Sequence, residues 1–521
     1  MGANQIKVVE AILESGTSAL LTAVETMRRQ VSHRLDSQQR ALRGQYLTPI
    51  SVATFMSRMV ECRKSIVRIL DPGAGIGTLS AAVVAEMCRR PVPPEVIHVT
   101  AYEIDAGLIG YLRVTLDLCR KLCNEMGIHF ESHILNSDFL EVGASALVSK
   151  LLDTPEHERF DCAILNPPYR KIGRESRERR LLRAIGLETT NLYTGFLAVT
   201  SRLLAPGGEM VAITPRSFCN GAYFEPFRRF FLREMRFSRI HVFEARDRTF
   251  ADDDVLQENI VFRAVRTTHL PSHVIVSSSI DPGGQNSCMR MVSHNYIVQP
   301  GDPRVFIHIA PEGDGDQIRK KMASLDATLA NIGLTVSTGR VVDFRVKDLL
   351  RAHPEANTVP LIYPCHLRGG FVIWPNANTR KSQALALCQG ADDLLVPAGY
   401  YVLVKRFTAK EERRRVVAAV YDPTRVRADR VAFENHLNYY HVRGAGLPPT
   451  LAKGLATFLN STLVDAYFRQ FSGHTQVNAT DLRSLKYPRR ELLIELGKQI
   501  GENLIDQKEI DRLVNEIVFH G

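Results

Sequence analysis

Short apolar runs alternate with longer stretches of helical periodicity between residues 65 and 265. Many of these runs end in a glycine turn or an acidic residue, which marks the end of a strand. Strands and helices that alternate at this spacing are typical of βαβ units in a doubly wound, mostly parallel sheet. The pattern predicts an α/β fold with about seven strands, over residues 66–70, 96–102, 133–135, 160–165, 209–214, 240–243 and 260–265.

The rest of the chain shows other patterns. Residues 1–43 look helical with one polar side, and beyond roughly residue 275 the alternation fades into short irregular strands. Helical periodicity returns from residue 451 and again over 489–519. Because 521 residues exceed one ordinary core, we predict an N-terminal helical segment over 1–43, the α/β domain over 44–270, and a mixed α+β domain over 271–521.

Composition narrows the class of protein. Hydrophobic residues make up 45% and charged residues 23%, with no signal-peptide pattern and no 18-residue apolar window, so we expect a cytoplasmic protein without a membrane span. The net charge of +10 favours a polyanionic partner, although a mildly basic enzyme without nucleic acid fits equally well. Nine cysteines lack Cys-x-x-Cys spacing, which indicates free thiols in a reducing compartment and no metal site.

One tetrapeptide carries the most specific chemistry. Asn166, Pro167, Pro168 and Tyr169 directly follow the apolar run 160–165. The prolines fix φ and keep the residues before them extended, so an amide, a carbonyl and an aromatic ring meet at one point. This arrangement suits a planar amino group that must be held and stacked. The competing interpretation is a proline-rich turn that ends a strand.

A glycine turn follows the first predicted strand. Asp71 precedes Gly73, Gly75 and Gly77, and the turn opens a helix whose N-terminal N–H groups are free to bind a ligand. The spacing differs from the dinucleotide fingerprint G-x-G-x-x-G, and Asp71 would repel a pyrophosphate but suits a ligand with an amino group. A purely structural glycine turn is the alternative.

Two further acids follow the next strands. Glu103 can accept hydrogen bonds from two ribose hydroxyls, and Asp138 can hold an exocyclic amine of adenine. Each acid alone could simply be solvated. Together with Asp71, at the carboxyl edge of one sheet, they describe a nucleoside that carries an amino acid. We therefore predict S-adenosyl-L-methionine as cofactor.

The order of these motifs resembles a known family. The Gly-Gln-Tyr-Leu-Thr-Pro element at 44–49 comes first, then the glycine loop, the tetrapeptide and a long C-terminal part. This order resembles that of gamma-type N6-adenine DNA methyltransferases of type II restriction–modification systems, especially Eco57I-like and PstI/BsuBI-like methylases. Elements at 337–340, 460–462 and 473–478 are similar to theirs.

The resemblance implies a fold and an activity. The fold would be a Rossmann-like, seven-stranded S-adenosylmethionine-dependent methyltransferase domain, followed by a C-terminal target-recognition domain. The activity would be that of a site-specific DNA-methyltransferase (adenine-specific), EC 2.1.1.72, which flips adenine out of duplex DNA. We expect a monomer whose partners are double-stranded DNA and, at the same site but not necessarily in complex, a cognate restriction endonuclease.

The resemblance also assigns residues. Asn166 Oδ1 and the Pro167 carbonyl would accept the N6 hydrogens, while Tyr169 stacks on the base. Tyr46, Thr48 and Pro49 would close over the methionine end, with Thr48 at its carboxylate. Phe262 would pack on the flipped base, although a core phenylalanine is as plausible. Separately from the resemblance, the densest basic segment of the chain, around Arg413 and Arg414, and the polar loop with His474, Gln476 and Asn478 are expected to contact DNA, with solvated charge or helix capping as the alternative.

Three other functions fit some of these features. An RNA adenine methyltransferase would use the same chemistry on another substrate. A protein glutamine methyltransferase would also hold a planar NH2 group, but it would not normally carry a long basic C-terminal domain. A non-catalytic DNA-binding subunit is the third, and the intact set of Asp71, Glu103, Asp138 and Asn166 argues against it.

Overall fold

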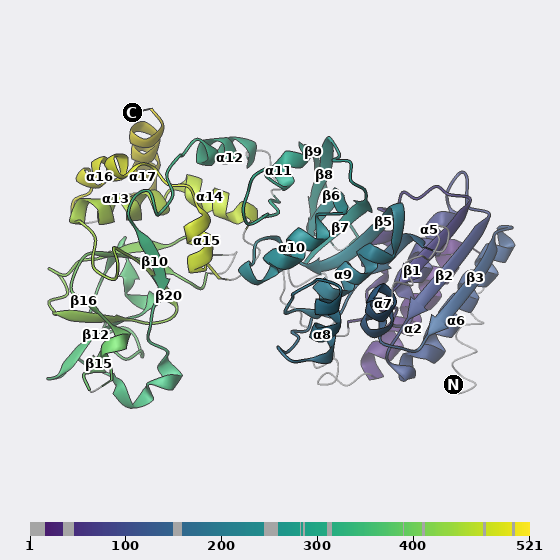
Figure 1. Ribbon diagram of the computed structural model, residues 1–521, viewed down its shortest axis with the longest axis horizontal. Coiled ribbons are helices and arrows are strands. Elements are labelled where there is room, and N and C mark those ends of the chain that lie inside the picture. The colour runs from purple at the N-terminus through teal and green to yellow at the C-terminus, as the bar shows by residue number, and fades with distance from the viewer. Residues whose placement is uncertain are drawn as a thin grey trace. The chain divides into compact units, whose positions relative to one another are not determined.

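The computed structural model describes residues 16–34, 46–148, 159–243, 259–281, 283–284, 287–309, 315–388, 390–408, 412–471, 476–502 and 506–520. The chain divides into two compact units, Met1–Pro311 and Glu312–Gly521 (Figure 1). The predicted boundary at residue 270 is therefore wrong. Two strands beyond it continue the sheet of the first unit, where β8 pairs with β6 and β9 pairs with β8.

The first unit contains a nine-stranded sheet in the order β3-β2-β1-β4-β5-β7-β6-β8-β9. Each predicted strand is present, and the two added strands make the sheet larger than the predicted seven-stranded one. The strands are β1 Ile66–Asp71, β2 Val96–Tyr102, β3 His129–Leu135, β4 Phe160–Leu165, β5 Leu204–Pro215, β6 Met235–Phe243, β7 Asn259–Arg266, β8 His273–Ser279 and β9 Cys288–Ser293.

The strands β3, β2, β1, β4 and β5 run parallel to one another. Asp71 pairs with Ala101, and Leu70 pairs with Ala163, so β1, β2 and β4 end at the same edge. The chain order reverses at β1, which lies between β2 and β4. In open α/β sheets, ligands bind outside the carboxyl ends of strands at such a switch point.

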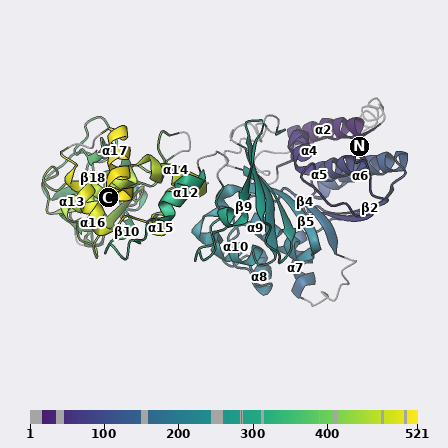
Figure 2. The same ribbon diagram turned by 90° about the horizontal axis from the view of Figure 1, so that it is seen from above.

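Alternate side chains of the strands pack into two separate cores. Ile69 belongs to the core under α2 Thr17–Arg34, α4 Ile50–Ser57, α5 Thr78–Cys88 and α6 Ala106–Glu125. Leu70 belongs to the opposite core, under α7 Phe139–Val148, α8 Arg177–Ala184, α9 Leu192–Leu203 and α10 Glu225–Phe231. Figure 2 shows the two helix layers on either side of the sheet. Within the predicted segment 1–43, α2 is thus part of the α/β unit.

The second unit is a mixed α+β structure. Its six-stranded sheet has the order β10-β20-β17-β18-β14-β13, and its five-stranded sheet the order β11-β15-β12-β19-β16. The strands are β10 Thr335–Thr338, β11 Leu350–Arg351, β12 Thr358–Ile362, β13 Leu367–Arg368, β14 Phe371–Val372, β15 Ala384–Ala386, β16 Leu395–Pro397, β17 Tyr401–Lys405, β18 Ala418–Tyr421, β19 Arg430–Phe433 and β20 Leu437–His441.

Helices pack on the six-stranded sheet of this unit and share its core. They are α13 Pro449–Leu459, α14 Thr462–Phe471, α15 Ala479–Ser484, α16 Arg490–Lys498 and α17 Gln507–Val514, and α12 Gly315–Ala323 precedes the first strand. The short helix α11 His294–Ile297 belongs to the first unit. Among the described residues, no helix is long and apolar enough to cross a membrane.

Candidate active site

A cavity of about 550 Å³ lies at the carboxyl ends of β1, β2 and β4. Its volume is typical of a small-molecule site. Seven of the residues singled out from the sequence line it: Tyr46, Gly73, Gly75, Glu103, Asp138, Asn166 and Pro168. The structure therefore brings the glycine loop, two acids and the tetrapeptide together around one space.

The glycines of the loop have different tasks. Gly75 has φ +57°, and a Cβ atom there would lie 3.0 Å from Leu47 Cδ2, so glycine lets the segment after Tyr46 close on the loop. Gly77 has φ +88° and does not line the cavity. A Cβ atom on Gly77 would lie 2.9 Å from Leu112 Cδ1, because α5 packs against α6 there. Gly77 therefore has a packing role, and its contact with the cofactor stays a prediction.

Asp71 lies beneath the glycine loop and is completely buried. Its Oδ2 accepts a hydrogen bond from Ser80 Oγ at 2.7 Å, while Oδ1 has no hydrogen-bond partner among the described residues. Burial raises the pKa of Asp71 to about 7, against the opposing effect of Ser80. Asp71 is not a lining residue of the cavity and stabilises the loop, so its contact with a ligand stays a prediction.

The other two acids face the cavity. Glu103 Oε2 accepts from the Gly75 N–H at 2.7 Å, and Oε1 accepts from the Asp105 N–H at 2.7 Å. Burial raises the pKa of Glu103. Asp138 Oδ1 accepts from the Leu140 N–H at 2.8 Å, at the start of α7. Backbone N–H groups therefore hold both carboxylates in place at the cavity wall.

Apolar walls of the cavity were missed by the sequence reasoning. Ile104 directly follows Glu103 and is 60% exposed, and Phe139 directly follows Asp138. The Phe139 ring packs against Tyr102 and Phe196, with ring centroids 5.2 and 5.3 Å apart, and all of these residues line the cavity. In the sequence, the apolar residue directly after each strand-end acid could have indicated these walls. The combination of carboxylates and apolar walls fits a nucleoside.

Asn166 joins the tetrapeptide to the segment at 46–49. Its Nδ2 donates to the Tyr46 carbonyl at 3.2 Å and to Thr48 Oγ1 at 3.1 Å. Thr48 is 5% exposed and does not line the cavity, so its hydroxyl faces Asn166 and not the predicted cofactor carboxylate. Pro49 is the N-cap of α4, where its carbonyl accepts from the Ala53 N–H at 3.0 Å. Thr48 and Pro49 thus have local structural contacts.

Tyr169 completes the surroundings of Asn166. Its hydroxyl lies 3.0 Å from Asn166 Oδ1 and 3.2 Å from the Ile213 carbonyl, and can donate to one of them at a time. Its ring meets Tyr193 edge-on with centroids 6.2 Å apart. Burial raises the pKa of the Tyr169 hydroxyl well above its usual range, so the group stays a neutral donor. Neither Tyr169 nor the buried Pro167 lines the cavity, so their contacts with a substrate stay predictions.

Phe262 lies in the hydrophobic core and not at the cavity. It is completely buried in β7, between β5 and β6. Its ring packs against Phe237 and Phe218, with centroids 5.3 and 6.0 Å apart. The predicted contact with a flipped base is wrong for this residue, because both neighbouring strands and the facing helices enclose its side chain.

The chain is similar to known restriction–modification methylases. The family model "Eco57I restriction-modification methylase" matches residues 115–250. The type II methyltransferase M.PstI of Providencia stuartii is 41% identical over 95% of this chain and 96% of its own. The type II methyltransferase M.BsuBI of Bacillus subtilis is 41% identical over 96% of this chain and 98% of its own. The chain belongs to this family of type II methyltransferases.

A solved structure shares the fold of this methyltransferase. It is the type IIL restriction–modification enzyme MmeI in complex with DNA. The alignment covers 99% of this chain and 75% of the MmeI chain, with a TM-score of 0.53 and 11% sequence identity. S-adenosylmethionine is the methyl donor of a methyltransferase in this family, and the lining of the cavity fits it. In the described part of the chain, no cluster of His, Cys, Asp and Glu residues could hold a metal ion.

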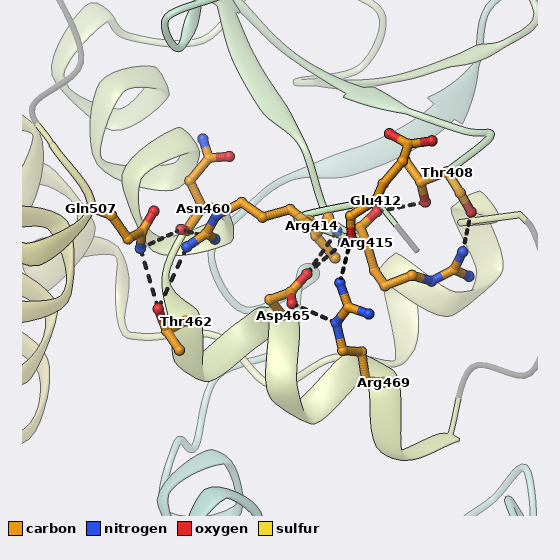
Figure 3. Close-up of polar contacts among 10 residues, drawn as sticks. Thr408, Glu412, Arg414, Arg415, Asn460, Thr462, Asp465, Arg469 and Gln507 are labelled. Atoms are coloured by element: carbon orange, nitrogen blue, oxygen red, sulfur yellow. Dashed lines mark hydrogen bonds and ion pairs between the residues drawn. The ribbon is translucent and has the colours of Figure 1, made fainter. Parts of the chain in front are cut away.

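The basic segment of the second unit is largely engaged within this unit of the methyltransferase (Figure 3). Arg414 is half-buried and donates to the Asn460 carbonyl, and burial lowers the pKa of its guanidinium. Arg415 is buried, and its backbone N–H donates to Asp465 at 2.6 Å. Arg413, in contrast, is exposed. Of the two arginines predicted to contact DNA, Arg414 is therefore held by its own unit.

The polar loop predicted to contact DNA is described only in part. His474 lies outside the described residues. Gln476 is half-buried and bridges to Phe407 through the backbone. Asn478 is the N-cap of α15, and its backbone N–H donates to Asp481 Oδ2 at 2.9 Å. Helix capping, the alternative considered for Asn478, accounts for this position.

Proposed function

We propose that this methyltransferase is a site-specific DNA-methyltransferase (adenine-specific), EC 2.1.1.72. It would transfer a methyl group from S-adenosylmethionine to N6 of adenine in duplex DNA and so protect the site from a partner endonuclease. One observation carries the proposal: Asn166 and Pro168 line the same cavity as Glu103 and Asp138. An amide that can hold an amino group thus adjoins a site suited to a nucleoside.

The walls of the cavity assign roles to individual residues. Glu103 is proposed to accept from the ribose hydroxyls, and Asp138 from the adenine amine of the cofactor. Ile104 and Phe139 would flank the adenine ring with apolar surface. Tyr46 would adjoin the methionine end. When bound, S-adenosylmethionine supplies an electrophilic methyl group on a sulfonium.

The tetrapeptide would act on the substrate amine. The lone pair of an aromatic amine is delocalised into its ring, so the amine is a poor nucleophile. If Asn166 Oδ1 and the Pro167 carbonyl accept its hydrogens, the nitrogen moves toward tetrahedral geometry and its lone pair becomes available. Tyr169 would stack on the extruded base and offset part of the lost base stacking. Positioning and fixed dipoles, without a covalent intermediate, supply the catalysis.

The second unit is proposed to read the target sequence. It belongs to the part of the chain over which M.PstI and M.BsuBI align. The net charge of +10 suits a DNA partner. Arg413, as an exposed cation, is proposed to contact phosphate, and Gln476 to contact a groove. A restriction endonuclease with the same recognition site is the proposed functional partner, and the protein is proposed to act as a monomer in the cytoplasm.

Transfer of a labelled methyl group tests the proposal. The purified chain is incubated with methyl-labelled S-adenosylmethionine and, separately, with unmethylated duplex DNA, RNA and protein extract. Label in duplex DNA is expected, with a loss of roughly 100-fold or more in Asn166→Ala. The control Asn124→Ala changes an exposed asparagine at the end of α6 and should leave the rate unchanged. Label in RNA or in protein alone would instead favour the RNA adenine or the protein glutamine methyltransferase.

A further inference from the structure

The side-chain amide of Asn166 is held from several directions. A primary amide offers two N–H donors and an oxygen with two acceptor positions. Both donors are used, one by the Tyr46 carbonyl at 3.2 Å and one by Thr48 Oγ1 at 3.1 Å. One acceptor position lies 3.0 Å from the Tyr169 hydroxyl. Among the described residues, this leaves the second acceptor position of Oδ1 open.

These neighbours determine which way the amide points. The oxygen and nitrogen of an asparagine side chain have nearly the same shape, so hydrogen-bond partners decide the orientation. The Tyr46 carbonyl can only accept. If the amide were turned over, Oδ1 would face this carbonyl oxygen at about 3.2 Å and the two would repel. The Tyr46 carbonyl therefore selects the orientation, and the Thr48 hydroxyl, as acceptor, supports it.

We infer that Thr48 is a positioning residue for Asn166: while the Tyr46 carbonyl selects the orientation of the amide, the Thr48 hydroxyl holds the amide in place with its acceptor oxygen available to the substrate amine. The inference rests on the proposed function, because only an amine substrate needs an acceptor there. Thr48 acts through Asn166 and contacts neither the cofactor nor the reacting atoms.

The surroundings of Thr48 suit this role. Its neighbours Tyr46 and Leu47 line the cavity, while Thr48 itself is 5% exposed and outside the lining. The following Pro49 begins α4, and Asn166 follows directly on β4, so each partner is attached to a regular element. Groups held by rigid elements keep catalytic geometry better than groups in loops. The segment that adjoins the methionine end thus also orients the catalytic amide.

Substitutions of Thr48 can distinguish the positioning of Asn166 from a direct contact between Thr48 and the cofactor. Thr48→Val keeps the shape of the side chain and removes the acceptor, whereas Thr48→Ser keeps the acceptor. We expect Thr48→Val to slow single-turnover methyl transfer to duplex DNA by about tenfold to a hundredfold, since a half-buried N–H of Asn166 loses its partner. The Kd for S-adenosylmethionine should stay within about twofold, and Thr48→Ser should regain most of the rate.

Controls distinguish the possible failures. Thr54→Val, a half-buried threonine in α4, should leave both quantities unchanged. Thermal melting checks that each variant is folded, and Thr48→Ala replaces Thr48→Val if the latter is not. A wild-type rate in Thr48→Val, or a weakened Kd for S-adenosylmethionine, overturns the inference. If Asn166→Ala also methylates at the wild-type rate, the proposed function fails; if Asn166→Ala is inactive, only the inference about Thr48 fails.

Discussion

Glu103 at the end of β2 accepts a hydrogen bond from the backbone N–H of Gly75 at 2.7 Å. This contact links two neighbouring strand ends, because Gly75 belongs to the loop that follows β1. The second carboxylate oxygen accepts from the Asp105 N–H, so the position of the side chain is fixed before any ligand binds. The two backbone donors hold this carboxylate at the cavity wall, where ribose hydroxyls can donate to it.

Glu103→Ala should therefore weaken cofactor binding. We expect the Kd for S-adenosylmethionine to rise by roughly tenfold to a hundredfold, because hydrogen bonds to charged groups contribute about 1.5–3 kcal/mol. Isothermal titration calorimetry measures this change. Glu131→Ala in β3 is the matched control, because that side chain is 48% exposed. An unchanged Kd in Glu103→Ala would contradict the assigned role.

Asp71 should make the stability of the first unit depend on pH. Its folded pKa of about 7 lies above the ordinary value of 3.8, so the folded state holds a proton that the unfolded state loses. This contribution is complete below about pH 4 and is lost as the pH rises toward 7. Asp71→Asn should reduce the loss of unfolding free energy between pH 5 and 8 by about 2 kcal/mol. Urea denaturation at both pH values tests this, and equal pH dependence in both proteins would contradict it.

Gly77→Ala should destabilise the protein through two separate effects. The positive φ of +88° strains any L-residue, and the added Cβ meets Leu112. Gly127→Ala is the matched control, because Gly127 has φ +71° with nothing within 4 Å of its Cβ position. Strain alone costs about 1 kcal/mol, so Gly127→Ala should lose about that much and Gly77→Ala about 2–4 kcal/mol. Equal melting temperatures would show that packing against α6 contributes nothing.

Arg413 and Arg414 should respond differently to replacement by alanine. Arg413→Ala should weaken DNA binding without changing stability. The slope of the logarithm of the DNA-binding constant against the logarithm of the salt concentration should become shallower by about one unit. Arg414→Ala should lower stability by about 1 kcal/mol, because the Asn460 carbonyl loses a hydrogen bond. Fluorescence anisotropy across a salt series and thermal melting measure the two effects. The reverse pattern would exchange the roles of the two residues.

The alternation of strands and helices was predictable over much of the first unit, because buried parallel strands read as apolar runs. The predicted domain ended at residue 270 because the alternation of strands and helices ends there. The strands β8 and β9 extend the edge of the sheet without a helical crossover between them. The acids were placed correctly at strand ends. The direction of their side chains was not predictable. Asp71 ends β1 and Glu103 directly follows β2, yet Asp71 lies beneath the loop and Glu103 faces the cavity.

Some residues have roles that depend on packing and that the residue type alone does not predict. Ile104 and Phe139 resemble core residues in the sequence, and only the folded strand ends expose them to the cavity. Phe262 has an aromatic ring that could stack on a base, but it is buried inside a central strand. Thr48 was assigned to the cofactor from its motif alone. Its contact with Asn166 joins positions 118 residues apart, which no local pattern reveals.

Methylation of adenine N6 should depend on the site around Asn166. Mass spectrometry of nucleosides from the DNA of cells that express the protein tests it most directly, with cells that lack other DNA methyltransferases as host. We expect N6-methyldeoxyadenosine to accumulate with the wild-type protein and to be absent with Asn166→Ala. Methylated cytosine in place of methylated adenine, or undiminished N6-methyldeoxyadenosine with Asn166→Ala, would contradict it.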